Sequence, residues 1–208
     1  LASLHFVTED DGVKNLKREG FSSSIEFVGN SMIDSLKLML QSDIYKNSKY
    51  DNTGAILLTC HRPSNVDNRA SLEKVYDMCS TIDKKIVWPV HPRSMSSLKK
   101  FSLLEKFTRI ENLTLIGPLN YCDFVKMMNT STVVVTDSGG VQEEAPSLGI
   151  PVLVTRKTTE RVEAVESGTV KLVGTEYEQI VQEASHLMDD QKAYERMSSV
   201  ANPYGDGH

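Results

Sequence analysis

The feature that most constrains the fold of this chain is an alternation between short apolar runs and amphipathic helical patterns. The runs are rich in β-branched residues and nearly continuous in apolar character. Strands that are covered on both faces have this composition, as in a parallel sheet. The alternation predicts an α/β fold with a Rossmann-like, doubly wound parallel sheet. The predicted strands are Leu4–Thr8, Ile25–Val28, Ala55–Thr59, Ile86–Val90, Leu113–Ile116, Thr132–Thr136, Pro151–Val154 and Val170–Val173.

The segments between these runs carry apolar residues at helical spacing. Gly20 and Gly149 stand where two of the predicted helices should stop. Thr175 and Glu178 predict a capping box at the start of a late helix. Asn65 and Asp67 are expected to cap another helix. The clearest apolar faces are Leu72, Val75, Tyr76, Cys79 and Ile82 in one segment, and Ile180, Val181, Ala184, Leu187 and Met188 in another.

Composition excludes several kinds of partner and location. The net charge is -5 and no basic stripe is present, so nucleic acid is not an expected partner. No apolar run approaches about 18 residues, so no membrane association is expected. Cys60, Cys79 and Cys122 form no C-x-x-C pair, which predicts free thiols in a cytoplasmic protein. The first residues, Leu1–Phe6, resemble no signal peptide and indicate a segment of a longer protein.

Polar clusters follow the predicted strands, where ligand sites of such folds gather. In the first, Ser138, Gly139 and Gly140 follow a strand and open a helix. Glycines admit a ligand close to the backbone, and free N–H groups of a helix start bind phosphate. Glu144 lies about one and a half turns further, where a carboxylate can accept hydrogen bonds from ribose hydroxyls. A plain strand–helix turn with acidic first-turn residues is the alternative, and Asp137 is more readily a local cap than a catalytic acid.

The other clusters offer cations and apolar walls at further strand ends. His61 and Arg62 can reach a diphosphate or, alternatively, only tie down their loop. His91 and Arg93 either face the same cleft or are merely solvated. Phe124 is either an apolar wall for a base or ordinary helix core. The last cluster contains Arg156, Lys157 and Arg161, which suit a pyrophosphate or, alternatively, form a solvated loop paired with Glu160 and Glu163.

Metal and nicotinamide sites lack support in this sequence. The histidines are far apart, and H-E-x-x-H and G-x-G-x-x-G are both absent. We therefore expect no metal and no cofactor.

Taken in this order, the motifs resemble those of the non-hydrolysing UDP-N-acetylglucosamine 2-epimerases, over essentially the whole chain. The most specific match is the run Asp137–Gly149. A departure is Val162, because the family often has proline after the Thr-Glu-Arg triplet. Further matching segments are Gly29–Asp34, His61–Asp67, Thr158–Arg161, Gly168–Thr175 and Asn202–Gly207.

The resemblance implies a two-domain fold like that of GT-B glycosyltransferases. Residues 1–28 would end the N-terminal Rossmann-like domain, and residues 29–208 would form the C-terminal, UDP-binding domain, with a hinge near residues 29–31. The family interconverts UDP-N-acetylglucosamine and UDP-N-acetylmannosamine by eliminating UDP and adding it back. Its acid/base carboxylates lie in the first domain, so this segment would supply the UDP site and be inactive alone. A homodimer serving cell-surface polysaccharide synthesis is also implied.

Roles carried over from the family concern the departing UDP. His61 would contact the diphosphate as the one catalytic candidate in this segment, and His91 would lie in a possible activator site. Two alternatives remain: a glycosyltransferase donor domain and a non-catalytic nucleotide-sugar-binding module. The implied substrate-binding residues are His61, Phe124, Ser138, Gly139, Gly140, Glu144, Arg156 and Arg161.

Overall fold

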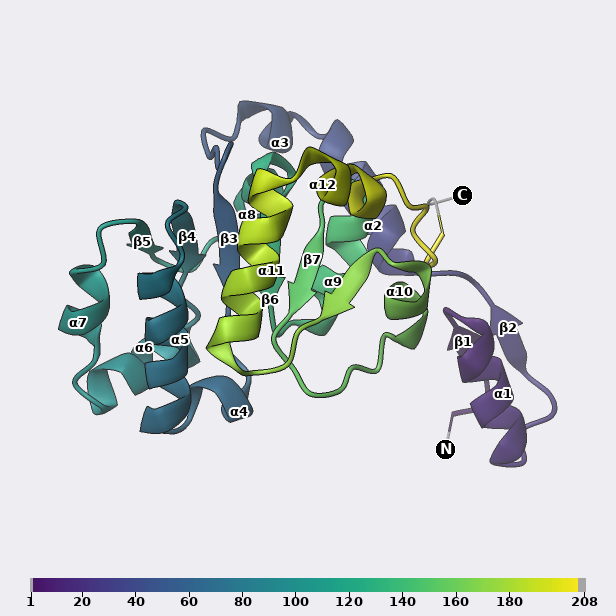
Figure 1. Cartoon of the computed structure of the whole chain (residues 1–208). Coiled ribbons are helices and arrows are strands. Elements are labelled where there is room, and N and C mark those ends of the chain that lie inside the picture. Colours follow the sequence, from purple (N-terminus) through teal and green to yellow (C-terminus); the bar gives the residue numbers. More distant parts are fainter. Residues whose placement is uncertain (1, 206–208) are drawn as a thin grey trace.

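The computed structural model of the chain describes residues 2–205. Its centre is a six-stranded sheet, parallel throughout, with the order β5-β4-β3-β6-β7-β8 (Figure 1). This confirms the predicted doubly wound sheet, and each predicted strand occurs within one residue of its expected ends. The strands are β3 (Ile56–Thr59), β4 (Ile86–Pro89), β5 (Leu113–Ile116), β6 (Val133–Thr136), β7 (Val152–Val154) and β8 (Val170–Leu172).

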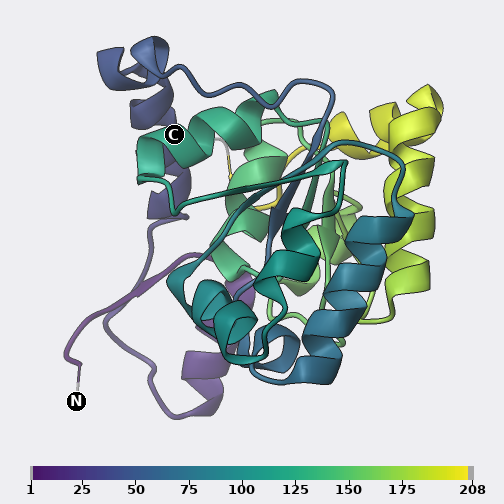
Figure 2. The same ribbon diagram turned by 90° about the vertical axis from the view of Figure 1, so that its left-hand side faces the viewer.

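Helices cover both faces of this sheet. On one face α5 and α11 lie side by side (Figure 2). The short helix α4 (Pro63–Val66) follows the inner strand β3. That face carries α5 (Arg69–Thr81), α6 (Pro92–Lys100), α7 (Leu104–Thr108), α11 (Tyr177–Asp189) and α12 (Gln191–Ser198). The other face carries α2 (Ser31–Gln41), α3 (Asp43–Asn47), α8 (Tyr121–Thr130), α9 (Gly139–Ser147) and α10 (Val162–Ser167).

Successive strand residues enter opposite cores, which explains the continuous apolar runs. In β3, Ile56 and Leu58 belong to the core beneath α5 and α11. Leu57 between them belongs to the core beneath α8 and α9. Because neighbouring side chains of a strand point to opposite faces, a sheet covered on both sides needs apolar residues at every position.

The first elements form a separate unit. β1 (His5–Val7) and β2 (Ile25–Phe27) pair in parallel as a two-stranded sheet, joined by α1 (Asp10–Arg18) (Figure 1). Phe6 and Phe27 are 67% and 60% exposed, so these apolar side chains of the small sheet are largely uncovered. Gly29 follows with a φ of +70°, a conformation that favours glycine. A domain boundary at residues 28–29 stays a prediction.

Two predicted helix caps are wrong. The N-cap of α11 is Glu176 and makes no side-chain cap, because its carboxylate instead accepts the ammonium group of Lys74. The N-cap of α5 is Asn68, whose side chain accepts the N–H of Ser71. The expected caps serve tertiary contacts instead, since Asn65 binds Asp137 and Asp67 binds Arg93. The predicted stop at Gly149 is confirmed, with a φ of +69° just after α9.

The strand order changes direction between β3 and β6. Strands β4 and β5 extend the sheet on one side of this point, and β7 and β8 extend it on the other. A crevice for ligands forms at such a switch point, outside the carboxyl ends of the strands. None of the helices within residues 2–205 has the length and apolar character needed to cross a bilayer.

Candidate functional site

Asp137 organises the loops at the switch point. Its side chain is fully buried directly after β6 and accepts the backbone N–H groups of His61 and Arg62 at 2.9 and 2.8 Å. It also accepts the amide of Asn65 at 3.0 Å, and that amide donates again to the carbonyl of Thr155 after β7. The loops after three strands are therefore joined through one carboxylate, which favours a structural role for Asp137.

The start of α9 has no side-chain cap. Ser138 is the N-cap but makes no side-chain capping bond, and the first turn carries no acidic residue. The first N–H groups of a helix lack intrahelical partners and carry the positive end of the dipole. A Cβ on Gly139 would lie 3.1 Å from the Glu160 carboxylate, and one on Gly140 would lie 3.1 Å from Met32. The first turn of α9 therefore lacks the acidic residues that the alternative interpretation expected. Its two glycines have no side chain to keep a ligand away from the backbone.

Two buried carboxylates follow in the second turn of α9. Glu144 accepts the hydroxyl of Tyr121 at 2.6 Å. Burial raises the pKa of Glu144, the Tyr121 hydrogen bond lowers it, and the charge of Glu143 raises it. Glu143 accepts the amide of Asn30 at 2.6 Å and forms an ion pair with Arg161. Arg161 is thus paired with Glu143. Within residues 2–205 the Glu144 carboxylate has one side-chain hydrogen-bond partner, Tyr121.

A second ion-pair group joins the loops after β3 and β7. Arg156 Nη2 donates to Glu160 at 2.6 Å, and Arg62 Nη2 lies 3.3 Å from the other carboxylate oxygen. The hydrogen bond from Arg156 lowers the pKa of Glu160 to about 2, although burial acts in the opposite direction. The charged loop is therefore paired with Glu160, as the alternative interpretation expected, and it presents its arginines beside the start of α9.

His61 and His91 are neighbours at the ends of β3 and β4. Their ring centroids are 5.1 Å apart, and His61 Nδ1 lies 3.2 Å from Asp137. Burial lowers the pKa of His91, and the charges of His61 and Arg93 act in the same direction. Arg93 itself points elsewhere, because it makes two hydrogen bonds to Asp67 at 2.8 and 2.6 Å.

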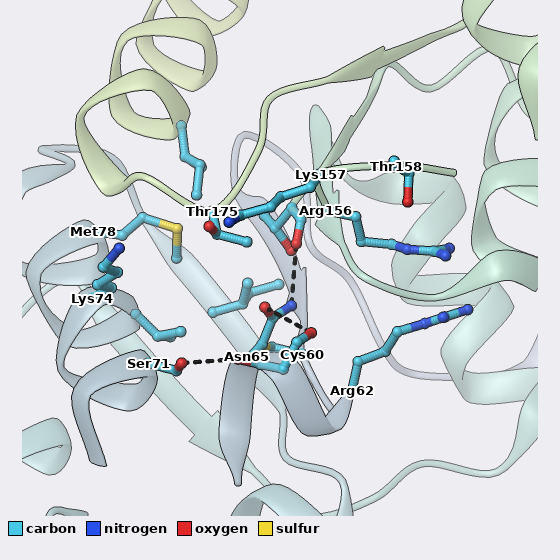
Figure 3. A pocket seen from close by; sticks show the side chains of 15 residues that line it. Cys60, Arg62, Asn65, Ser71, Lys74, Met78, Arg156, Lys157, Thr158 and Thr175 are labelled. Carbon is cyan, nitrogen blue, oxygen red and sulfur yellow. Dashed lines mark hydrogen bonds between the residues drawn. The ribbon is translucent and has the colours of Figure 1, made fainter. Parts of the chain in front are cut away.

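A cavity of about 490 Å³ lies beside this cluster, between α5 and α11 (Figure 3). Its apolar part includes Leu58, Met78 and Ile180. Arg62 and Arg156 line its edge and extend in the same direction from different loops (Figure 3). The cavity therefore adjoins the arginine cluster.

The structure brings most of the predicted site residues together. His61, Arg156, Arg161 and the Ser138–Gly140 turn lie on connected loops, and Glu144 follows on α9. Phe124 is half-buried on α8 and packs against the core beneath that helix, in keeping with the core interpretation. Its role as an apolar wall for a base stays a prediction. Within residues 2–205 no cluster of three or more His, Cys, Asp or Glu side chains is arranged for a metal ion.

The sequence did not reveal three residues that shape this site. Asn30 reaches Glu143 across 113 positions, and no spacing pattern connects them. Tyr121 stood inside a recognised loop, but only the structure shows that its hydroxyl meets Glu144. Glu160 was expected only as a generic loop partner.

Comparisons with known proteins identify the family of this chain. A sequence profile described as UDP-N-acetylglucosamine 2-epimerase matches residues 1–208. The UDP-N-acetylglucosamine 2-epimerase of Campylobacter jejuni is 40% identical over 100% of this chain and 58% of its own length. The structure of the Neisseria meningitidis UDP-GlcNAc 2-epimerase bound to UDP-GlcNAc has a TM-score of 0.82 and 36% identity, covering 99% of this chain and 58% of that one.

A more distant likeness concerns the fold alone. The glycosyltransferase WaaG, involved in lipopolysaccharide biosynthesis, has a TM-score of 0.56 at 12% identity, covering 98% of this chain and 58% of that one. The fold is thus shared by epimerases and glycosyltransferases of the GT-B type, and this chain spans 58% of the Campylobacter jejuni relative. With the profile matching from the first residue to the last and a relative 40% identical along the whole chain, the chain belongs to the UDP-N-acetylglucosamine 2-epimerase family.

Proposed function

We propose that the protein carrying this chain is a non-hydrolysing UDP-N-acetylglucosamine 2-epimerase and that this chain supplies its UDP site. The observation that carries the proposal is the uncapped start of α9, with no acid in its first turn, beside the arginines of two other loops. Such a site suits a diphosphate, because helix N–H groups and guanidinium groups both bind phosphate oxygens. The UDP-GlcNAc bound to the Neisseria meningitidis relative supports the ligand class.

Each site residue has a defined task in this proposal. Gly139 and Gly140 offer N–H groups to the diphosphate, with Ser138 at the entrance. Around the diphosphate, His61 adds a hydrogen-bond donor, and Arg156 and Arg161 add positive charge. Glu144 accepts ribose hydroxyls in place of the Tyr121 hydroxyl it binds here. Phe124 borders the uracil. His91 belongs to the possible activator site, next to the His61 ring.

The chemistry asks this half of the enzyme to stabilise the leaving group. Elimination of UDP develops negative charge on the departing phosphate oxygen, and preorganised donors lower the barrier most when they face that oxygen. His61 Nδ1 lies beside Asp137, which orients the ring and leaves Nε2 for the diphosphate. The groups that move the C2 proton belong, by the family resemblance, to the other domain of the enzyme.

The non-hydrolysing assignment rests on the run Asp137–Gly149, which resembles that branch of the family. We also propose a homodimer in the cytoplasm that serves cell-surface polysaccharide synthesis. The location has its own support, because Cys60, Cys79 and Cys122 are all buried free thiols, as expected in a reducing compartment.

The test is turnover by the full natural polypeptide that carries this chain. With UDP-N-acetylglucosamine alone we expect UDP-N-acetylmannosamine, and in D₂O we expect deuterium at C2 of the product. Release of free sugar would indicate a hydrolysing enzyme, dependence on an acceptor would indicate a glycosyltransferase, and binding without turnover would indicate a binding module. Ser138→Trp should abolish UDP binding in titration calorimetry, whereas Ser80→Trp, exposed at the end of α5, should not.

A further inference from the structure

Glu160 occupies a position that a phosphate group would suit. Its carboxylate meets guanidinium groups from two loops, Arg156 at 2.6 Å and Arg62 at 3.3 Å. The same carboxylate lies 3.1 Å from where a Cβ of Gly139 would stand, at the first residue of α9. Two cations and the positive end of a helix dipole therefore surround one anionic side chain.

The start of α9 has no anion of its own. Ser138 makes no capping bond, and neither of the first residues of the helix is acidic. A carboxylate and a phosphate both accept paired N–H groups from arginine, so one can take the place of the other. Glu160 thus pairs, beside the start of α9, with the same arginines that a bound diphosphate would also use.

We propose that Glu160 is a built-in occupant of the anion site, which neutralises Arg62 and Arg156 when no nucleotide is bound and moves aside when a diphosphate enters. The inference rests on the proposed UDP site and adds a competitor within it. Glu160 then sets how tightly the site holds the product UDP, since each binding event must first break its ion pairs.

The exposure of Glu160 permits such a movement. Its side chain is 43% exposed, and partly exposed ion pairs contribute little net stability. Glu143 provides the contrast, because it pairs with Arg161 but is only 6% exposed and also accepts Asn30. Two carboxylates near the same turn therefore differ in how they are held: Glu143 is buried between Asn30 and Arg161, whereas the side-chain partners of the half-exposed Glu160 carboxylate are Arg62 and Arg156.

Arg156 has donor capacity to spare. Its side chain is 13% exposed, yet its Nη1 is buried without a hydrogen-bond partner among the described residues. A buried guanidinium donor without an acceptor is unfavourable. A diphosphate offers more acceptor oxygens than one carboxylate, so the exchange gives Arg156 the partner that Glu160 does not.

The test compares Glu160→Gln with wild type by calorimetric titration with inorganic pyrophosphate and, separately, with UDP. Because the amide keeps the shape but removes the charge, we expect both ligands to bind at least about threefold more tightly. Glu166→Gln, exposed on α10 away from the arginines, serves as the matched control and should change neither affinity. Unchanged or weaker pyrophosphate binding in Glu160→Gln, or no pyrophosphate binding at all, would overturn the proposal.

The pyrophosphate titration separates this inference from the proposed function. Tighter pyrophosphate binding by the variant, with UDP bound no better than pyrophosphate, would support the Glu160 exchange and contradict the UDP site. A crystal structure with UDP gives a second check. Glu160 should then lie beyond hydrogen-bond distance of Arg156, and a retained contact at 2.6 Å beside a bound diphosphate would overturn the exchange.

Discussion

The carboxylate of Asp137 accepts the backbone N–H of His61 at 2.9 Å, and this contact joins the ends of β6 and β3 where the sheet changes direction. The same carboxylate holds Arg62 and Asn65. One fully buried side chain therefore decides where the histidine and the arginine of the neighbouring loop stand relative to α9.

Asp137→Ala should lower the free energy of unfolding by about 3 kcal/mol or more, because the buried Asn65 amide and the partly buried N–H groups of His61 and Arg62 lose their acceptor. Asp137→Asn should lose less, since its carbonyl oxygen still accepts. Urea denaturation followed by circular dichroism measures both. Asp34→Ala, exposed on α2, should change stability by no more than about 0.5 kcal/mol. Wild-type stability in Asp137→Ala would show that the loops hold their positions without it.

Gly139→Ala should separate binding from stability. Alanine is a better helix residue than glycine, so the free energy of unfolding should stay constant or rise by up to about 1 kcal/mol. The new methyl group would lie 3.1 Å from the Glu160 carboxylate, in the space where the diphosphate is expected. UDP affinity in calorimetry should therefore fall by about tenfold or more. Undiminished affinity would place the nucleotide away from this turn.

The stability difference between wild type and Glu160→Gln should depend on pH. The pKa of Glu160 is lowered from 4.5 to about 2, chiefly by Arg156, so its stabilisation is fully present above pH 4.5. It should be lost as the pH falls from 4.5 toward 2. Urea midpoints of both proteins across this window measure the effect, and added salt should reduce it because the pair is partly exposed. A pH-independent difference would contradict the lowered pKa.

Val162→Pro should stabilise the chain. Val162 is the first residue of α10 and is 47% exposed. Proline is favoured there, since its missing N–H would be unpaired anyway, and it restricts the unfolded chain. We expect a gain of about 0.5–1 kcal/mol in thermal or urea unfolding. Nucleotide affinity should not change, because Arg161 before it already lies outside the helical region, at φ -102° and ψ 61°. A loss of stability would mean that the Arg161 backbone must adjust to a proline.

The amino-acid sequence by itself determined the sheet, its two covered faces and the loops that carry the site. Local rules suffice for these features. Strands covered on both sides need apolar residues at every position, and glycines at the start of a helix let a ligand approach the backbone. The strand ends around Thr59, Thr136 and Val154 were predictable in this way, and so was the turn at Ser138–Gly140.

Only the tertiary structure decided which polar side chains meet. Asn65 was expected to cap a helix and instead binds Asp137, and Arg161 was expected to meet phosphate and here pairs with Glu143. Glu160 became a candidate competitor only when two distant loops placed arginines on it. Long polar side chains have several partners of similar energy, and the choice depends on which loops the sheet order brings together, so no local pattern specifies it.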